Sequence, residues 1–362
     1  MNQTSLALQQ IKKTNPYFSG KMSCSEFIEL NGFYSRPITA IEYNYTIAFT
    51  ILAYKHFYQF QVLLRTLYSR SNFHCIHVDV KAPIIMYKYV VKLSECLENV
   101  YLSPVRLTVR WAGFSILEAE RSCQLLLLNK EKTWKYYMNL AGTELPLQTN
   151  YERANILALG NGLKNDITSY KNTHLYRHAM KLHPPPENVT LWKGEFHVIL
   201  TRKFVEYLHT SPLAQHLYIY LNGTNVPDEH FYSSLNRRPD FPGYSWKSYS
   251  NLRLLSHYKV WIETQRHMCK SQIFGRGELC QFTYKDLTHV MESKRLFVNK
   301  FNQNVDLIGI DCIEQWLKVK QYSPNKIRKE DYRQFPFFQQ SNMSEVQDKE
   351  EEEALAKLTG KI

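Results

Sequence analysis

The sequence predicts a mixed α/β fold in which a mainly parallel sheet is flanked by helices. Short apolar runs of strand length alternate with segments of helical spacing between residues 44 and 140. This β-α-β-α order is typical of a parallel sheet with helices on both faces. Of the 362 residues, 44% are hydrophobic and 22% charged, which suits a packed core in one large domain or two modest ones.

The first two strands are each followed by a helix. Residues 46–54 form an apolar run that predicts a buried strand, and residues 57–68 carry apolar side chains at helical spacing. Residues 73–78 predict a second strand, which ends at Asp79. A helical segment then runs over residues 83–96, so the two strands are expected to lie parallel.

Three further elements complete the alternation. Residues 100–102 predict a short strand, and residues 136–140 predict a longer one. Between them a helix is predicted from Ser115 to about residue 129. Its start is indicated by Ser115 and Glu118, which have the spacing of a capping box.

Ligands of parallel sheets bind beyond the carboxyl ends of the strands. Asp79 and the turn at residues 111–115 fall at such ends. Neither the G-x-G-x-x-G pattern nor the P-loop pattern occurs, so a dinucleotide site and a P-loop site are not supported.

The chain divides into three regions by composition. Residues 1–43 are polar and mixed, and we expect a stem or lead-in there. Residues 44–320 are expected to form the main domain. Residues 321–362 are expected to be a C-terminal extension with an acidic, disordered tail. The apolar run at residues 46–54 is too short to span a bilayer, so we expect that the natural N-terminus precedes this sequence.

The formal net charge of +12 limits the classes of partner. A basic surface attracts nucleic acid, anionic membranes or phosphorylated small molecules. No helix-turn-helix, zinc-finger or RNA-recognition pattern occurs, so no nucleic-acid partner is expected. The positive charge instead suits a diphosphate-bearing donor.

Cysteines and glycosylation sequons favour an oxidising compartment. The seven cysteines form no C-x-x-C pair, so a zinc site is not expected, and a disulfide could close the polar stretch between Cys269 and Cys280. Asn-x-Ser/Thr sequons begin at Asn2, Asn44, Asn188, Asn222 and Asn342. Together these features favour a chain that is glycosylated and disulfide-bonded.

Several motifs, in order, resemble the core 2 β-1,6-N-acetylglucosaminyltransferase family and its I-branching relatives, glycosyltransferase family 14. They are Asn-Phe-His-Cys-Ile-His-Val-Asp at residues 72–79, Asn-Leu-Ala-Gly-Thr-Glu-Leu-Pro at 139–146, Pro-Asp-Glu at 227–229 and Leu-Phe-Val-Asn-Lys-Phe at 296–301. The resemblance extends from about Cys24 to Leu317.

The resemblance implies a GT-A-like, Rossmann-type catalytic domain that uses UDP-N-acetylglucosamine and a glycan acceptor on a glycoprotein. It also implies a type II membrane protein of the Golgi with a luminal catalytic domain, anchored by a segment outside this sequence. The oligomeric state is left open.

The same resemblance implies a pairing of the cysteines. The implied disulfides are Cys24–Cys96, Cys75–Cys123 and Cys269–Cys280. Cys312 corresponds to a cysteine whose partner in the family lies in the stem, and that partner has no counterpart here.

An inverting transfer needs one base to remove the proton of the acceptor hydroxyl. Glu229 is similar to the catalytic base of the family. From the residues alone, the Pro-Asp-Glu run also suits the first turn of a helix, where acidic side chains are favoured. Asp228 is interpreted as a local structural acid.

The departing UDP needs its negative charge neutralised. The chain has no D-x-D motif, and the resemblance implies a metal-independent enzyme without a cofactor, in which basic side chains replace the metal. Lys300 matches one of these, and Arg276 is the best candidate for the second.

Four further residues are candidate ligands by resemblance. Asp79 could accept a hydrogen bond from the uridine or ribose, or could cap the turn after its strand. Trp111 matches an aromatic residue near the donor, and Trp261 matches one that stacks on the acceptor. Glu144 matches an acidic position of the acceptor site, although a structural role is the alternative.

These motifs predict an inverting enzyme that moves N-acetylglucosamine to a β-1,6 branch on an O-glycan-like acceptor. Three departures leave alternatives open: residues 53–55 replace His-His-Lys, residues 283–287 lack the usual Gly-x-Gly-Asp-Leu, and residues 163–180 align poorly. The alternatives are a xylosyltransferase acting on protein serine and a catalytically inactive relative that binds glycan.

Overall fold

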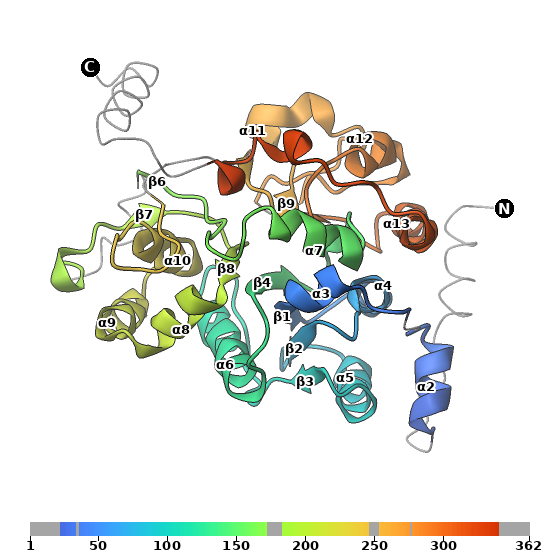
Figure 1. The fold of residues 1–362 in the computed structure, drawn as a ribbon, viewed down its shortest axis with the longest axis horizontal. Helices are drawn as coiled ribbons and strands as arrows, with labels where there is room; N and C mark the ends of the chain where they lie inside the picture. The colour runs from blue at the N-terminus through green and yellow to red at the C-terminus, as the bar shows by residue number, and fades with distance from the viewer. Residues whose placement is uncertain (1–21, 34–35, 172–182, 246–252, 276, 340–362) are drawn as a thin grey trace.

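The computed structural model describes residues 22–33, 36–171, 183–245, 253–275 and 277–339. A five-stranded sheet lies at its centre, in the order β3-β2-β1-β4-β8 (Figure 1). The first four of these strands are parallel, and β8 joins β4 in the antiparallel direction. This confirms the predicted fold class. The strands are β1 (Ile47–Ala53), β2 (Phe73–Val78), β3 (Val100–Leu102), β4 (Tyr136–Ala141) and β8 (Ile199–Thr201).

The three helices that connect these strands confirm the predicted alternation. They are α4 (Phe57–Leu67), α5 (Ile84–Cys96) and α6 (Ser115–Lys130). The capping box predicted at Ser115 is wrong, because Phe114 is the N-cap and Ser115 is the first residue inside α6. The Ser115 hydroxyl accepts a hydrogen bond from the backbone N–H of Arg110 instead, 2.9 Å away. It therefore fixes the preceding turn.

The second half of the chain adds two small sheets and more helices. One sheet pairs β6 with β7, and the other has the order β5-β10-β9. These strands are β5 (Leu145–Pro146), β6 (Tyr170–Lys171), β7 (Trp192–Lys193), β9 (His257–Tyr258) and β10 (Phe297–Val298). The helices are α7 (Asn150–Ala158), α8 (Arg202–Thr210), α9 (Pro212–Leu221), α10 (Asp228–Asn236), α11 (Ile262–Gln265), α12 (Leu287–Met291) and α13 (Leu307–Tyr322).

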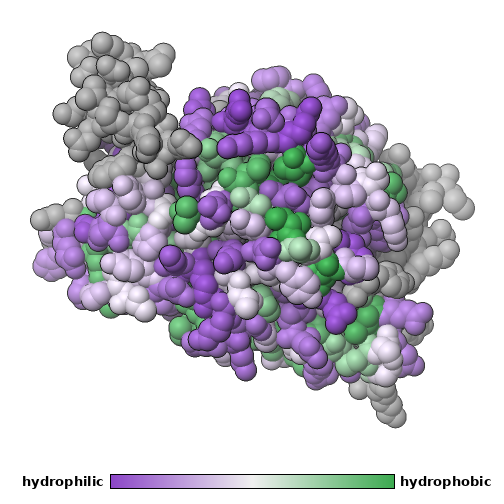
Figure 2. Space-filling view, viewed as in Figure 1, coloured by the Kyte–Doolittle hydropathy of each residue, from purple (hydrophilic) through white to green (hydrophobic). Residues whose placement is uncertain are grey.

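Alternate residues of the central strands enter different hydrophobic cores. Phe49 and Ile51 of β1 pack with α4 and α5, whereas Ala48 packs with α6, α8 and α10. This follows from the two-residue period of side chains along a strand. A third core lies between the β5-β10-β9 sheet and α13. On the face seen in Figure 2, hydrophobic residues form separate patches within a mostly hydrophilic surface.

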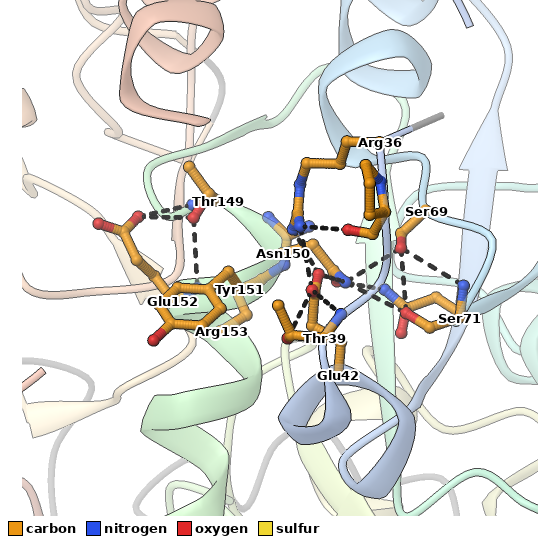
Figure 3. A network of polar contacts seen from close by, with 12 residues as sticks. Arg36, Thr39, Glu42, Ser69, Ser71, Thr149, Asn150, Tyr151, Glu152 and Arg153 are labelled. Atoms are coloured by element: carbon orange, nitrogen blue, oxygen red, sulfur yellow. Dashed lines mark hydrogen bonds and ion pairs between the residues drawn. The ribbon is translucent and has the colours of Figure 1, made fainter. Parts of the chain in front are cut away.

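The packed chain begins before the predicted boundary at residue 44. Within the predicted stem, α2 (Cys24–Leu30) buries Phe27, and α3 (Ala40–Asn44) is held by a polar network (Figure 3). In that network, Glu42 of α3 accepts hydrogen bonds from Arg36 and from Asn150 of α7. The stem was predicted from polar composition, but charged and amide side chains here form a packed network rather than a solvated segment.

The packed chain also continues beyond residue 320. Tyr332, Phe335 and Phe337 are buried in the same core as α4 and α5. The acidic run predicted to be a tail lies outside the described residues. Within the described residues, none of the helices combines the length and apolar character needed to cross a bilayer.

All three expected disulfides are confirmed. The Cα atoms of Cys24–Cys96, Cys75–Cys123 and Cys269–Cys280 are 5.1, 5.5 and 5.8 Å apart. Cys312 is an exposed free cysteine on α13. Of the sequon residues, Asn44 and Asn222 are exposed, whereas Asn2, Asn342 and the side chain of Asn188 lie outside the described residues.

Candidate active site

Basic side chains gather at the carboxyl ends of β1 and β2. Lys55 and Lys81 place their ammonium groups 5.1 and 5.4 Å from the centre of the Tyr54 ring. Burial and the positive charges of Lys55 and Lys300 lower the pKa of His56 to about 4. Lys300 therefore lies at this edge although it is far along the chain. The edge where a parallel sheet binds its ligands thus carries positive charge.

Asp79 is buried directly after β2, and its carboxylate organises the loop that leads to Trp111. One oxygen accepts the backbone N–H of Lys81 at 2.7 Å, and the other accepts that of Val109 at 2.9 Å. This is the strand-end capping that the sequence left as an alternative. Each oxygen retains a lone pair, so a hydrogen bond to a donor remains chemically possible.

The turn at Trp111 lies beside the start of α10. The Trp111 side chain is 69% exposed, and the carbonyl of the next residue, Ala112, accepts the backbone N–H of Val226 at 2.8 Å. Both Ala112 and Val226 have positive φ, at 63° and 54°. Such backbone strain is concentrated at functional sites, and here it joins the expected donor side to the expected base, Glu229.

Glu229 occupies the first turn of α10, where the helix dipole favours an acidic side chain. Its side chain is 22% exposed, and its Oε2 lies 3.3 Å from the Nζ of Lys193. Its backbone carbonyl accepts the N–H of Gly194 at 2.6 Å and the hydroxyl of Ser233 at 2.9 Å. Asp228 is buried, as expected for a structural acid. The accessible carboxylate at this site therefore belongs to Glu229.

The sequence did not indicate that Lys193 would pair with Glu229. Lys193 ends β7 and also donates a hydrogen bond to the hydroxyl of Tyr170 on β6. Burial lowers the pKa of Lys193, but the negative charge of Glu229 and the contact with Tyr170 outweigh it, so the pKa is raised. The one local sign in the sequence was that Lys193 and Glu195 are charged residues among mostly apolar neighbours, which indicates charges that need partners when the segment is buried.

A second buried ion pair adjoins the first. Lys259, which follows β9, pairs with Glu195, which follows β7, and both side chains are buried. Burial raises the pKa of Glu195, but Lys259 and then Lys193 lower it below its ordinary value. The ends of β7 and β9 are thus joined by charges of opposite sign.

Glu144 is fully buried, and both of its oxygens are hydrogen-bonded. They face the Nε2 atoms of His197 and His257, and the amide of Asn299 donates to Oε1 at 2.9 Å. Burial raises the pKa of Glu144, but the two histidines outweigh it, and the pKa is lowered. The carboxylate is enclosed rather than offered to an acceptor. It instead links β9 to Asn299, the neighbour of Lys300.

Two groups of side chains in the described structure have metal-ligand spacing. In the first, ligand atoms of Glu144, His197 and His257 lie within 4.8 Å of one another. The Glu144 carboxylate of this group is already hydrogen-bonded to His197, His257 and Asn299, so these contacts explain the cluster without a metal ion. The second group contains Cys269 and Cys280, which are joined in a disulfide.

Lys300 follows β10 and lies beside the loop that contains Arg276. A Cβ placed on Gly275 would lie 3.4 Å from the Cε of Lys300. Arg276 itself lies outside the described residues. Trp261 is partly buried and forms an isolated β-bridge with Leu279 of the same loop. The structure therefore brings Lys300, Trp261 and the neighbours of Arg276 together.

Comparison with known proteins identifies the chain as a glycosyltransferase. The model of the Core-2/I-Branching enzyme family matches residues 47–291, and the chain belongs to this family. An enzyme of Bovine herpesvirus 4, a "β-1,3-galactosyl-O-glycosyl-glycoprotein β-1,6-N-acetylglucosaminyltransferase", is 27% identical over 342 residues, which cover 86% of this chain and 78% of that protein.

A second relative carries the same name with the number 3. This protein, from Bos taurus, is 27% identical over 328 residues, covering 84% of this chain and 74% of its own length. Among solved structures, apo mouse xyloside xylosyltransferase 1 has a TM-score of 0.27 and 14% identity, with 54% of this chain and 83% of that chain covered. That likeness is too low to support an argument.

Proposed function

We propose that this glycosyltransferase moves N-acetylglucosamine from UDP-N-acetylglucosamine to a β-1,6 position of an O-glycan on a glycoprotein. The activity for which the two relatives are named supports this substrate class. The single observation that carries the assignment to this chain is the partly exposed Glu229 carboxylate at the start of α10, in the family's sequence context.

The proposed reaction is a single displacement with inversion. Glu229 takes the proton of the acceptor hydroxyl, whose oxygen forms a bond to C1 of the sugar. The bond between C1 and the UDP oxygen breaks, and its electron pair leaves with UDP. Lys300 and Arg276 stabilise the diphosphate, and no metal is required. Lys55 and Lys81 add positive charge at the same edge of the sheet.

The resemblance further supports a location in the Golgi lumen with membrane attachment. Donor contacts are proposed for Asp79 and Trp111, and acceptor stacking for Trp261. A direct acceptor contact of Glu144 is not proposed, since both carboxylate oxygens are buried and hydrogen-bonded.

The test is acceptor-dependent UDP release by the secreted protein and by Glu229→Gln, with Galβ1-3GalNAc as acceptor. We expect release by the wild type and a loss of at least about 100-fold in kcat for the variant. Glu330→Gln changes an exposed glutamate on the C-terminal segment and is the matched control, expected to retain activity. UDP-xylose in competition tests the xylosyltransferase alternative, and binding of donor without turnover would indicate an inactive relative.

A further inference from the structure

We propose that Lys193 is a positioning residue for Glu229, whose carboxylate it holds oriented toward the acceptor hydroxyl. This inference rests on the proposed function, in which Glu229 is the base. A side-chain contact and a backbone contact carry it, and both come from the same short segment at the end of β7.

The side-chain contact is an ion pair in a largely enclosed place. Lys193 Nζ lies 3.3 Å from Glu229 Oε2, and the two side chains are 10% and 22% exposed. Charges that are partly removed from water interact more strongly and are screened less by salt. A cation at this distance favours the ionised form of a carboxylate. A general base must be ionised before it can accept a proton.

The backbone contact fixes the position of the first turn of α10. Gly194 donates its N–H to the carbonyl of Glu229 at 2.6 Å. A Cβ on Gly194 would lie 2.6 Å from the carbonyl oxygen of Thr168 and 2.8 Å from the Cβ of Ser233. A larger residue would therefore push β7 away from α10. The close approach holds the Lys193 side chain at the Glu229 carboxylate.

Other charged groups near the pair have partners that leave this assignment in place. Tyr170 on β6 accepts a hydrogen bond from Lys193, which orients the ammonium group. Glu195 after β7 pairs with Lys259 after β9. Asp228, next to Glu229 on α10, is buried in the helix start. Lys193 also lies close enough to Glu195 to interact with its charge, but its ammonium group is the one placed 3.3 Å from the Glu229 carboxylate.

The test is the pH dependence of kcat/KM for UDP release by the wild type, Lys193→Met and Lys193→Arg. Because Lys193→Met removes the cation beside the proposed base, the acidic limb of its pH–rate profile should lie at higher pH than that of the wild type. At neutral pH, the fold decrease in kcat of Lys193→Met should exceed the fold change in its KM for the acceptor. Lys193→Arg restores the charge and should return the limb toward its wild-type position.

Lys320→Met is the matched control. Lys320 on α13 is also a buried lysine in an ion pair, with its Nζ 2.9 Å from Glu152 Oε2 and its side chain 6% exposed. Its loss should lower the melting temperature and leave the acidic limb unchanged. A shifted limb in this variant would mean that loss of any buried lysine has the effect, and would overturn the proposal.

A folded Lys193→Met enzyme with an unmoved acidic limb would also overturn it. If that variant does not fold, Lys193→Gln keeps a donor toward Tyr170 without the charge, and the same shift is expected. Failure of the proposed function has a different result: the wild type releases no UDP with acceptor, or Glu229→Gln stays active. If the wild type is active, Glu229→Gln is inactive and the acidic limb of Lys193→Met does not move, the proposed function stands. Only the role of Lys193 is then contradicted.

Discussion

The backbone N–H of Val226 donates a hydrogen bond to the carbonyl of Ala112, 2.8 Å away, and both residues have left-handed backbone conformations. This bond joins two segments that are more than one hundred residues apart in sequence. One contains Trp111, the proposed donor contact, and the other leads directly to Glu229. Two residues with positive φ therefore link the turn at Trp111 to the start of the helix that carries Glu229.

The strain at residue 112 can be tested by Ala112→Gly. A left-handed conformation costs a residue with a Cβ roughly 1–2 kcal/mol, and glycine avoids this cost but loses more entropy on folding. We expect the free energy of unfolding to rise by about 0.5 kcal/mol in urea titrations. Ala119→Gly, inside α6, should lower it by about 1 kcal/mol or more. Equal losses in both variants would contradict the strain at Ala112.

Asp79→Asn tests how the carboxylate organises the loop to Trp111. The variant places an amide where one oxygen accepts the N–H of Val109, so we expect a loss of about 1–2 kcal/mol in the free energy of unfolding. Hydrogen exchange should become faster in peptides that span residues 105–113, and KM for the donor should rise. Asp240→Asn, at an exposed pair with Arg238, is the control. A raised KM with unchanged exchange would show instead that Asp79 acts by direct contact with the donor.

Lys300→Met tests the neutralisation of the leaving group. Because a fixed charge at the diphosphate stabilises the transition state, we expect kcat to fall by about 100-fold, with a smaller change in KM for the acceptor. Lys285→Met removes an exposed lysine and should be neutral. Wild-type activity should persist in EDTA. Loss of activity in EDTA that manganese restores would show that a metal performs the role assigned to Lys300.

His74 gives the folded protein a sensitivity to acid. Burial lowers the pKa of His74 to about 3, below the ordinary value near 6.5 expected in the unfolded chain. The unfolded state therefore binds a proton first, and stability falls as the pH drops from about 6.5 toward 3. In His74→Phe, the loss of unfolding free energy between pH 7 and 5 should be smaller by about 2 kcal/mol.

Denaturant titrations at the two pH values check this expectation. His74 stacks on Phe49 with ring centres 5.5 Å apart, so a phenyl ring fits the same packing. His216→Phe, at an exposed histidine, is the control and should leave the pH dependence unchanged. An identical pH dependence in wild type and His74→Phe would contradict the buried neutral state.

The sequence predicted the four parallel strands of the central sheet because their signals are local, whereas the antiparallel strand β8 was not predicted. Residues 73–78 lie between two segments whose apolar side chains have helical spacing, and the predicted strand matches β2 at both ends. Glu229 was found through a short motif that also explains its place at a helix start. In both cases, the residues that decide the structure are neighbours in the chain.

The remaining features depend on contacts between distant segments. Lys193 meets Glu229 only because β7 packs against α10, and Lys259 meets Glu195 only where β9 and β7 end together. Glu144 was assigned to the acceptor site by resemblance. Its burial against two histidines could not be predicted, because no neighbouring residue in the sequence indicates it. Side chains that gain their roles from long-range packing could not be identified from the sequence.

The most direct measurement of the central claim is the structure of the product. The wild-type protein would be incubated with UDP-N-acetylglucosamine and Galβ1-3GalNAc, and the trisaccharide analysed by NMR. We expect a β-anomeric N-acetylglucosamine joined to O6 of the GalNAc. An α-anomeric product would contradict the single displacement with Glu229 as base, and a linkage to another hydroxyl, or no product, would contradict the proposed β-1,6 transfer.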